Sequence, residues 1–94
     1  MEQADAALLE LARFIKNARP EDSLNLLRSL LTHSEIDALA QRLEILDGLA
    51  KGTPQREISE QLKVGIATVT RGSRVWKQDN IMLKNYFPRS RKSL

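Results

Sequence analysis

The residues best suited to chemistry lie in the segment 65–73, which reads GIATVTRGS. Arg71 offers a planar cation, and the neighbouring Gly72 lacks a side chain, so that a flat molecule can lie against the backbone. Arg42, on an earlier stretch, offers a second guanidinium. Two guanidiniums can sandwich an aromatic ring, and one of them can also pair with a carboxylate. Because an aromatic amino acid carries both groups, these residues predict a site for a small molecule of that kind.

Each residue considered for this site also has a simpler interpretation. Thr32, a fourth candidate, is an adequate helix N-cap without any ligand. Arg42 can be a surface ion-pair partner, and Arg71 can contact a phosphate. Gly72 can allow two helices to cross closely. Taken from the residues alone, both interpretations stay open.

A second set of residues forms a polar and basic face on the helix expected over 66–77. Val69 and Trp76 share one side of that helix. The face away from them has small, hydroxylic or basic side chains: Ala67, Thr70, Arg74 and Lys77. Such side chains suit the floor and walls of a DNA major groove. Gln55 and Arg56, in the first turn of the preceding helix, are placed to reach base edges or phosphates. The alternative is a helical hairpin that only packs.

The elements that must position these residues are all expected to be helices, because apolar residues recur at helical spacing and nothing reads as a strand. The expected helices cover residues 4–18, 20–31, 32–51, 54–62, 66–77 and 80–87. Thr32 begins the third as part of a capping box, Gly52 ends it, and Thr53 caps the fourth. The KVG turn that follows places Lys63 where the chain turns left-handed. A second turn, KQDN, separates the last two helices.

The apolar residues of the two short helices predict where they pack. Ile58 and Leu62 face inward from the first, Val64 fills the turn, and Val69 and Trp76 face inward from the second.

The third helix is apolar on two sides, since Ile45 and Leu49 fall roughly opposite Ile36. A chain of 94 residues has little of its own to cover both sides, so we expect a homodimer with helices packed across the interface.

Composition excludes several classes of protein. The chain has no cysteine, so disulfides and zinc–thiolate sites are ruled out, and no metal site is expected. No apolar run is long enough for a membrane span, and the acidic start is unlike a signal peptide, so a cytoplasmic location is expected. His33 is the only histidine, and no nucleophile–base pair is visible, which argues against an enzyme.

Charge is distributed unevenly along the chain. Residues 1–50 have nine acidic and five basic side chains, whereas residues 51–94 have ten basic and three acidic ones. A basic half beside an acidic half suits a module that binds a polyanion, although a solvated charged surface would look the same.

The segment from Leu31 to Lys77, including GTPQREISEQLKVGIATVTRGS, resembles the tryptophan repressor family. The resemblance implies an all-α fold, a six-helix helix-turn-helix repressor that forms an intertwined homodimer. Together with the helix pattern, it leads us to expect a single helical domain over residues 1–88 with the helix-turn-helix at 54–77, followed by a basic, flexible tail at 89–94. It also implies double-stranded operator DNA with twofold symmetry as a partner, and L-tryptophan as the corepressor.

The resemblance assigns roles to individual residues of the expected ligand site. The matching arginines, Arg42 and Arg71, bracket the indole, and Gly72 lets it approach. Thr32 meets the carboxylate through its hydroxyl, and Thr68 forms a wall. The ammonium group is received by main-chain carbonyls at Ser29 and Leu31 of the other subunit. The family commonly has a serine that also helps to hold this group, and this chain has Val75 at that position.

The DNA-side residues follow from position and from the resemblance together. They are Gln55, Arg56, Ser59, Gly65, Ile66, Ala67, Thr70, Arg74 and Lys77. Among them, Arg74 and Lys77 are expected at phosphates and Arg56 at guanine.

The sequence therefore predicts a sequence-specific DNA-binding repressor that L-tryptophan activates and that controls genes of tryptophan biosynthesis or transport. One alternative is the same DNA-binding fold with no tryptophan response, or with another ligand. A second is a protein-interaction module whose charged halves attract acidic partners.

Overall fold

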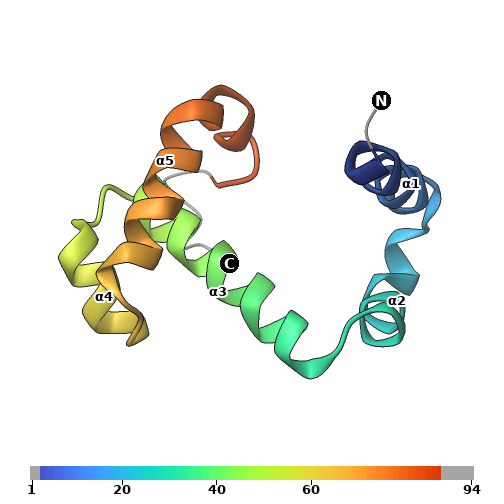
Figure 1. The fold of residues 1–94 in the computed structure, drawn as a ribbon, viewed down its shortest axis with the longest axis horizontal. Coiled ribbons are helices and arrows are strands. Elements are labelled where there is room, and N and C mark those ends of the chain that lie inside the picture. The colour runs from blue at the N-terminus through green and yellow to red at the C-terminus, as the bar shows by residue number, and fades with distance from the viewer. Residues whose placement is uncertain (1–2, 88–94) are drawn as a thin grey trace. The chain divides into compact units, whose positions relative to one another are not determined.

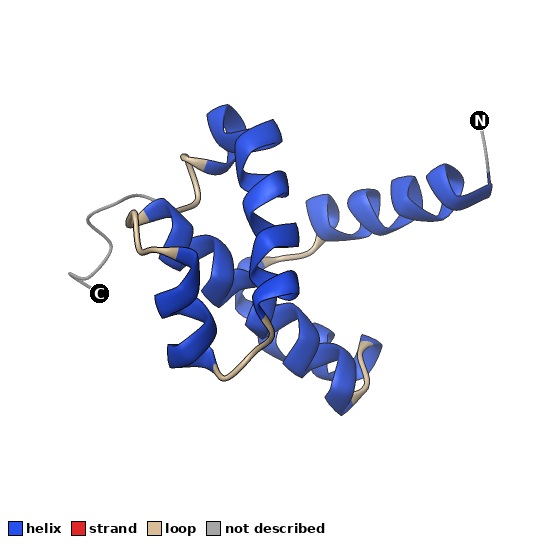
Figure 2. Ribbon diagram, turned by 60° about the vertical axis from the view of Figure 1, so that its left-hand side comes forward, coloured by secondary structure: helices blue, strands red, loops and turns tan. Residues whose placement is uncertain are grey.

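The computed structural model describes residues 3–87, and within them every regular element is helical (Figures 1 and 2). The elements are α1 (Gln3–Asn17), the 3₁₀ helix η1 (Pro20–Asp22), α2 (Ser23–Leu30), α3 (His33–Ala50), α4 (Gln55–Leu62) and α5 (Ile66–Leu83). The all-helical class is therefore confirmed for this part of the chain. No helix in residues 3–87 is both long and apolar enough to cross a membrane.

Contacts within the chain divide it into two compact units, Met1–His33 and Ser34–Leu94. In the first unit, Pro20 opens a 3₁₀ turn, and α2 starts only at Ser23, where an α-helix from Pro20 onward was expected. Local side-chain bonds account for the tight turn. Ser23 Oγ donates to the Pro20 carbonyl at 2.8 Å, and Arg19 Nε donates to Asp22 Oδ2 at 3.0 Å. Side chains that bond to nearby backbone compete with the regular helix in this way.

The second unit has a small apolar core in which α3, α4 and α5 meet. Ile45, Ile58 and Val69 are almost fully buried there, and three half-buried side chains surround them: Leu49, Leu62 and Val64. The inward positions expected for α4, the turn and Val69 are thus confirmed. Trp76 is only half-buried. Figure 1 shows α5 crossing α3 with α4 beside α5, so this core fixes the direction of α5.

The end of α3 matches the expected glycine cap, but the start of α4 does not match the expected threonine cap. Gly52 adopts a φ of 82°, and the Thr53 amide donates to the Gly48 carbonyl at 3.0 Å. Thr53 therefore belongs to the C-terminal cap of α3. The N-cap of α4 is Pro54, without a side-chain cap bond, so the assignment of that cap to Thr53 is wrong.

The turn between α4 and α5 contains Lys63 in the left-handed conformation, with φ 57° and ψ 46°, as expected. Ser59 holds this turn from two sides. Its carbonyl accepts the Lys63 and Val64 amides, and its Oγ donates to the Val64 carbonyl at 2.6 Å. The strained residue is therefore kept in place by hydrogen bonds rather than by glycine.

Replacing Lys63 with glycine is expected to raise the free energy of unfolding by roughly 0.5–1 kcal/mol. The left-handed cost for a residue with a side chain disappears, and the greater entropy of glycine in the unfolded chain offsets part of the gain. Thermal and urea unfolding measure the change. Gly52→Ala is the matched control, because its φ is also positive and an alanine there should destabilise. Equal stability of Lys63→Gly and the parent chain would contradict the prediction.

The break expected between the last two helices lies at Asp79, where two helices meet across a kink within α5. The helix α5 runs through the KQDN segment with one non-helical residue, Asp79, at φ −116° and ψ 18°. With α5 counted as one element, the described residues contain five α-helices and one 3₁₀ helix. After Leu83 the chain forms a turn that leads to the buried Phe87. The expected tail, 89–94, lies outside the described residues.

Candidate ligand cleft and nucleic-acid face

A cleft of about 220 Å³ lies between α3 and α5, within the second unit. It is lined by Arg42, Ile45 and Leu46 from α3 and by Thr68, Arg71, Gly72 and Val75 from α5. The structure thus brings together five of the residues expected at the ligand site. The other three, Ser29, Leu31 and Thr32, belong to the first unit.

The charge of this cleft comes from its two arginines. Both Arg42 and Arg71 are exposed, and within residues 3–87 neither guanidinium forms an ion pair or a hydrogen bond. The lining has no carboxylate, and Thr68 supplies its one side-chain hydroxyl. A cleft with two cations, apolar walls and one hydroxyl can accept a planar anion. Nothing described around Arg42 supports the simpler role of surface ion-pair partner.

Gly72 has a structural role that the sequence offered only as an alternative. A Cβ built on Gly72 would lie 2.7 Å from Ile45 Cγ2 and 3.9 Å from Leu49 Cδ1. Real Cβ atoms essentially never come within 3.0 Å of a neighbour. The glycine therefore permits the close crossing of α3 and α5, and the backbone it exposes also forms part of the cleft.

Sequence reasoning missed two residues of the cleft, Ile45 and Leu46. Both are on apolar stripes of α3, and Ile45 had been placed on the stripe facing away from Ile36. The signal that could have found them is their spacing from Arg42. Residues three and four positions along a helix share its face.

The residues expected to face DNA lie on the outer side of α4 and α5. Gly65, just before α5, is exposed, and so are Ile66 and Ala67 in the first turn of α5. Arg74 and Lys77 are exposed further along the helix. Arg56 is exposed on α4.

Gln55 and Thr70, also expected on this face, are half-buried and contact each other. Ser59 differs from the rest because its hydroxyl already donates to the turn, a contact that accounts for Ser59 without any DNA.

Gly65 is the N-cap of α5, and nothing in the fold requires a glycine there. Its φ of −65° suits any residue, and no atom lies within 4 Å of a Cβ built on it. The first amides of a helix have no partner within the helix, so this exposed end of α5 can receive an anion.

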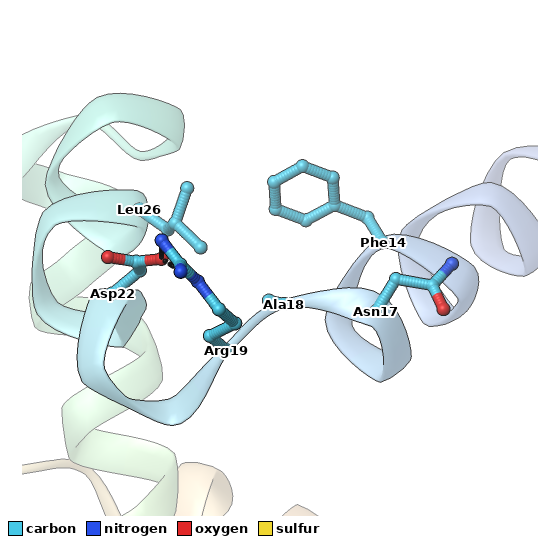
Figure 3. Close-up of a pocket in the computed structure, with 6 residues that line it drawn as sticks. All are labelled: Phe14, Asn17, Ala18, Arg19, Asp22 and Leu26. Atoms are coloured by element: carbon cyan, nitrogen blue, oxygen red, sulfur yellow. Dashed lines mark hydrogen bonds and ion pairs between the residues drawn. The ribbon is translucent and has the colours of Figure 1, made fainter.

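A shallower hollow of about 410 Å³ lies in the first unit, where α1, η1 and α2 meet (Figure 3). Its lining residues are Phe14, Asn17, Ala18, Arg19, Asp22 and Leu26. The charged groups of this hollow pair with each other, Arg19 Nη2 lying 3.0 Å from Asp22 Oδ2. No role had been predicted for it. In residues 3–87, no group of three or more potential metal-ligating side chains comes together.

Comparison with known proteins gives the class and then the family. Three relatives are each described as a Trp operon repressor homolog. That of Vibrio campbellii is 53% identical over 49 residues, covering 51% of this chain and 49% of the relative. That of Vibrio parahaemolyticus is 43% identical over 67 residues, covering 70% and 63%. That of Haemophilus influenzae is 40% identical over 78 residues, covering 82% and 74%. These names describe regulators and not enzymes.

The family model for the Trp repressor protein matches residues 6–91, and the chain belongs to that family. The chain spans about half of the Vibrio campbellii relative and just under two thirds of the Vibrio parahaemolyticus relative. No solved structure matches it.

Proposed function

We propose that this chain is a DNA-binding transcriptional repressor with L-tryptophan as its corepressor. The observation that carries the proposal is the α3–α5 cleft, where Arg42 and Arg71 lie with Gly72 beside apolar walls. Indole suits the guanidinium faces and the apolar walls, and the carboxylate suits the positive charge. The regulated genes would be those of tryptophan biosynthesis or transport, and the protein would act in the cytoplasm.

The DNA-binding part is the helix-turn-helix at 54–77, with α5 as the recognition helix. Its exposed outer face offers Ala67, Arg74 and Lys77 to the major groove and its phosphates. The free end of α5 at Gly65 and Ile66 would meet a phosphate. Arg56 on α4 would contact guanine.

A homodimer would complete both the fold and the ligand site. Several large apolar side chains are exposed in this chain by itself: Leu8, Leu11, Leu24, Leu27, Leu39 and Leu43. A subunit of this size gains stability when such faces are covered by a second copy. The resemblance places Thr32 at the ligand carboxylate and the carbonyls of Ser29 and Leu31, from the other subunit, at the ammonium group.

The position of the cleft suggests how the ligand controls DNA binding. The recognition helix forms one wall of the cleft and α3 forms the other, so a ligand between them would fix the direction of α5. In a dimer, this would hold two recognition helices at the spacing of successive major grooves, about 34 Å. Coupling of this kind is typically worth about 1–3 kcal/mol and is reciprocal, so DNA would also tighten ligand binding.

Titration calorimetry with L-tryptophan, followed by DNA binding with and without it, tests the proposal. Saturable binding at one site per subunit is expected, together with tighter binding to a twofold-symmetric operator. Indole-3-propionate, which lacks the ammonium group, is run beside it as the matched ligand. Absence of binding by both compounds would overturn the corepressor. DNA binding that does not weaken steeply with salt would overturn the helix-turn-helix assignment.

One observation favours a second candidate, a repressor of the same fold with a different ligand or none. Val75 lines the cleft with an apolar side chain, where the family commonly has a serine that helps hold the ammonium group. Loss of that acceptor costs about 0.5–1.5 kcal/mol of binding. If indole-3-propionate binds as well as L-tryptophan, the second candidate is favoured.

Replacing Gly65 with serine is expected to change stability and DNA affinity in opposite directions. Serine is at least as good an N-cap as glycine and meets no neighbouring atom, so unfolding should be unchanged or harder by a few tenths of a kcal/mol. Its side chain would occupy the space that a phosphate needs at the end of α5, so DNA affinity should fall about tenfold. Thermal unfolding and fluorescence anisotropy measure the two effects. Unchanged affinity would contradict the placement of this helix end against DNA.

A further inference from the structure

The turn between α4 and α5 contains a lysine in a backbone conformation that suits glycine. Lys63 has φ 57° and ψ 46°, and in residues 3–87 it is the only residue other than glycine with a positive φ. A side chain makes this conformation unfavourable, because its Cβ comes close to the following carbonyl oxygen. Ser59 offsets that cost through its carbonyl and its hydroxyl, which hold the turn closed. The fold therefore keeps a lysine where glycine would be more stable.

No contact within the described residues accounts for the lysine side chain. Lys63 is exposed, so its side chain adds nothing to the core. In residues 3–87 its ammonium forms no ion pair or hydrogen bond, not even with Glu60, which lies three residues earlier on α4. A cation after the last turn of α4 is attracted by the helix dipole. At an exposed position, however, this attraction is weaker than the cost of the left-handed conformation. Fold stability alone would favour glycine.

The neighbouring end of α5 offers a use for the charge. Two Cα–Cα steps of about 3.8 Å each separate Lys63 from Gly65, the N-cap of α5. The amides of Gly65, Ile66 and Ala67 find no acceptor among the described residues. The ammonium of a lysine is carried on a flexible four-carbon stem, so that of Lys63 can reach an anion held at these amides.

Ser59 also sets the direction of the first of these amides. The Val64–Gly65 peptide is trans, so its carbonyl and its N–H point to opposite sides. Ser59 Oγ, on α4, donates to the Val64 carbonyl at 2.6 Å, and the Gly65 amide is thereby turned away from α4. That amide is free to donate to a molecule outside the fold, and the exposed Lys63 lies beside it.

We infer that Lys63 is a DNA-contacting residue, whose ammonium meets the phosphate placed at the start of α5. The strained backbone is retained because binding uses a charge that glycine would not supply. A contact with a phosphate carries no sequence information, so it strengthens binding to every duplex by the same factor. The inference rests on the proposed DNA-binding function and adds a residue to it. It does not depend on the ligand cleft, which Lys63 does not line.

Substitutions at Lys63 in the whole chain test the inference. The probes are a twofold-symmetric duplex that the parent chain selects from randomised DNA, and a duplex of unrelated sequence. Lys63→Gly should unfold at a higher temperature than the parent chain, yet bind both duplexes about threefold to tenfold more weakly. The slope of log affinity against log salt concentration should become shallower by about one. Lys63→Asn, which tolerates the left-handed conformation but has no charge, should show the same losses. Lys63→Arg should retain both affinity and slope.

A second lysine provides the matched control for net charge. Lys51 is exposed just after α3 and pairs with Asp47 at 3.0 Å. Lys51→Asn removes the same unit of positive charge as Lys63→Asn, away from the turn. It should change the salt dependence of DNA binding much less than Lys63→Asn does.

DNA with single methylphosphonate groups, each replacing a charged phosphate by a neutral group, locates the contact. For the parent chain, one such replacement in each half-site should weaken binding through the loss of the Lys63 contact. Lys63→Gly should respond less to that replacement and should respond normally at the other phosphates. The effects of Lys63→Gly and Gly65→Ser on affinity should be less than additive, because both act on the same phosphate.

The outcomes distinguish the inference from the proposed function. If the parent chain selects no sequence, the proposed function itself fails. If the parent chain selects a sequence but Lys63→Gly keeps its affinity and salt slope, the inference is overturned. It is also overturned if Lys51→Asn lowers the slope as much as Lys63→Asn, because net charge alone would then act. The same holds if Lys63→Arg binds as weakly as Lys63→Gly, or if Lys63→Gly responds to every methylphosphonate as the parent chain does. Thermal unfolding shows that each variant is folded.

Discussion

Replacing Gly72 with alanine is expected to lower the free energy of unfolding by roughly 1–2 kcal/mol and to distort the α3–α5 cleft. The added Cβ would lie 2.7 Å from Ile45 Cγ2. Ile45 is 2% exposed, and its β-branched side chain cannot easily rotate away. Overpacking of a well-packed core costs about 1–3 kcal/mol, and the better helix propensity of alanine returns up to about 1 kcal/mol. Urea unfolding measures the net change.

Two further variants test whether the clash is the cause. Gly65→Ser adds a side chain at a glycine with no atom within 4 Å of its Cβ, so it should not destabilise. Ile45→Ala removes the methyl group that the new Cβ would meet. Its cost should therefore be smaller in the Gly72→Ala background than in the parent chain. If Gly72→Ala is as stable as the parent chain, α3 and α5 can move apart freely, and the crossing argument is wrong.

The core of the second unit could be predicted well from the sequence because its signals are local. The apolar spacing of α4 and α5 identified Ile58, Val64 and Val69, all of which are found in or against the core. The left-handed conformation of Lys63 followed from the helix-turn-helix pattern, whose turn usually has a glycine at that position. Such signals need only the residues of one motif, and the same motif holds the residues that we propose to face DNA.

The ends and joints of the helices were predicted less well, because several local conformations differ little in energy there. Pro20 can start either an α-helix or a 3₁₀ turn, and the Arg19–Asp22 contact accompanies the second. Thr53 can cap α4 or finish α3, and its amide bonds to α3. The joint expected at Asp79 or Asn80 does lie at Asp79, as a kink within α5 in place of an open turn.

The role of Gly72 shows where sequence reasoning about the site stops. Its residue type indicated that something approaches the backbone, and both a ligand and another helix satisfied that condition. The neighbour is Ile45, which is far from Gly72 in the sequence and comes close only through tertiary packing. Of the five expected residues in the cleft, Arg42, Arg71 and Gly72 were found from their chemistry, and Thr68 and Val75 from the family resemblance. The single domain over residues 1–88, the homodimer and the contribution of the first unit to the site stay predictions.

Arg71→Ala is expected to weaken L-tryptophan binding by about 1.5–3 kcal/mol, which is roughly tenfold to more than a hundredfold, while leaving stability nearly unchanged. Hydrogen bonds to charged groups contribute free energies of this size, and Arg71 lines the cleft without any partner among the described residues. Because it is exposed, its removal exposes no core and leaves no buried charge unpaired. Calorimetry measures the affinity, and thermal unfolding confirms that the fold is intact.

Arg74→Ala is the matched control, because Arg74 is exposed on the same helix but does not line the cleft. It should leave ligand affinity unchanged and weaken DNA binding without L-tryptophan. The slope of log DNA affinity against log salt concentration should become shallower by about one, the value for one lost phosphate contact. Arg71→Ala should instead leave ligand-free DNA binding as it is and lose the increase that L-tryptophan produces. If Arg71→Ala binds L-tryptophan normally but loses DNA affinity with or without the ligand, its guanidinium contacts a phosphate. The cleft would then need another cation, Arg42, to hold the carboxylate.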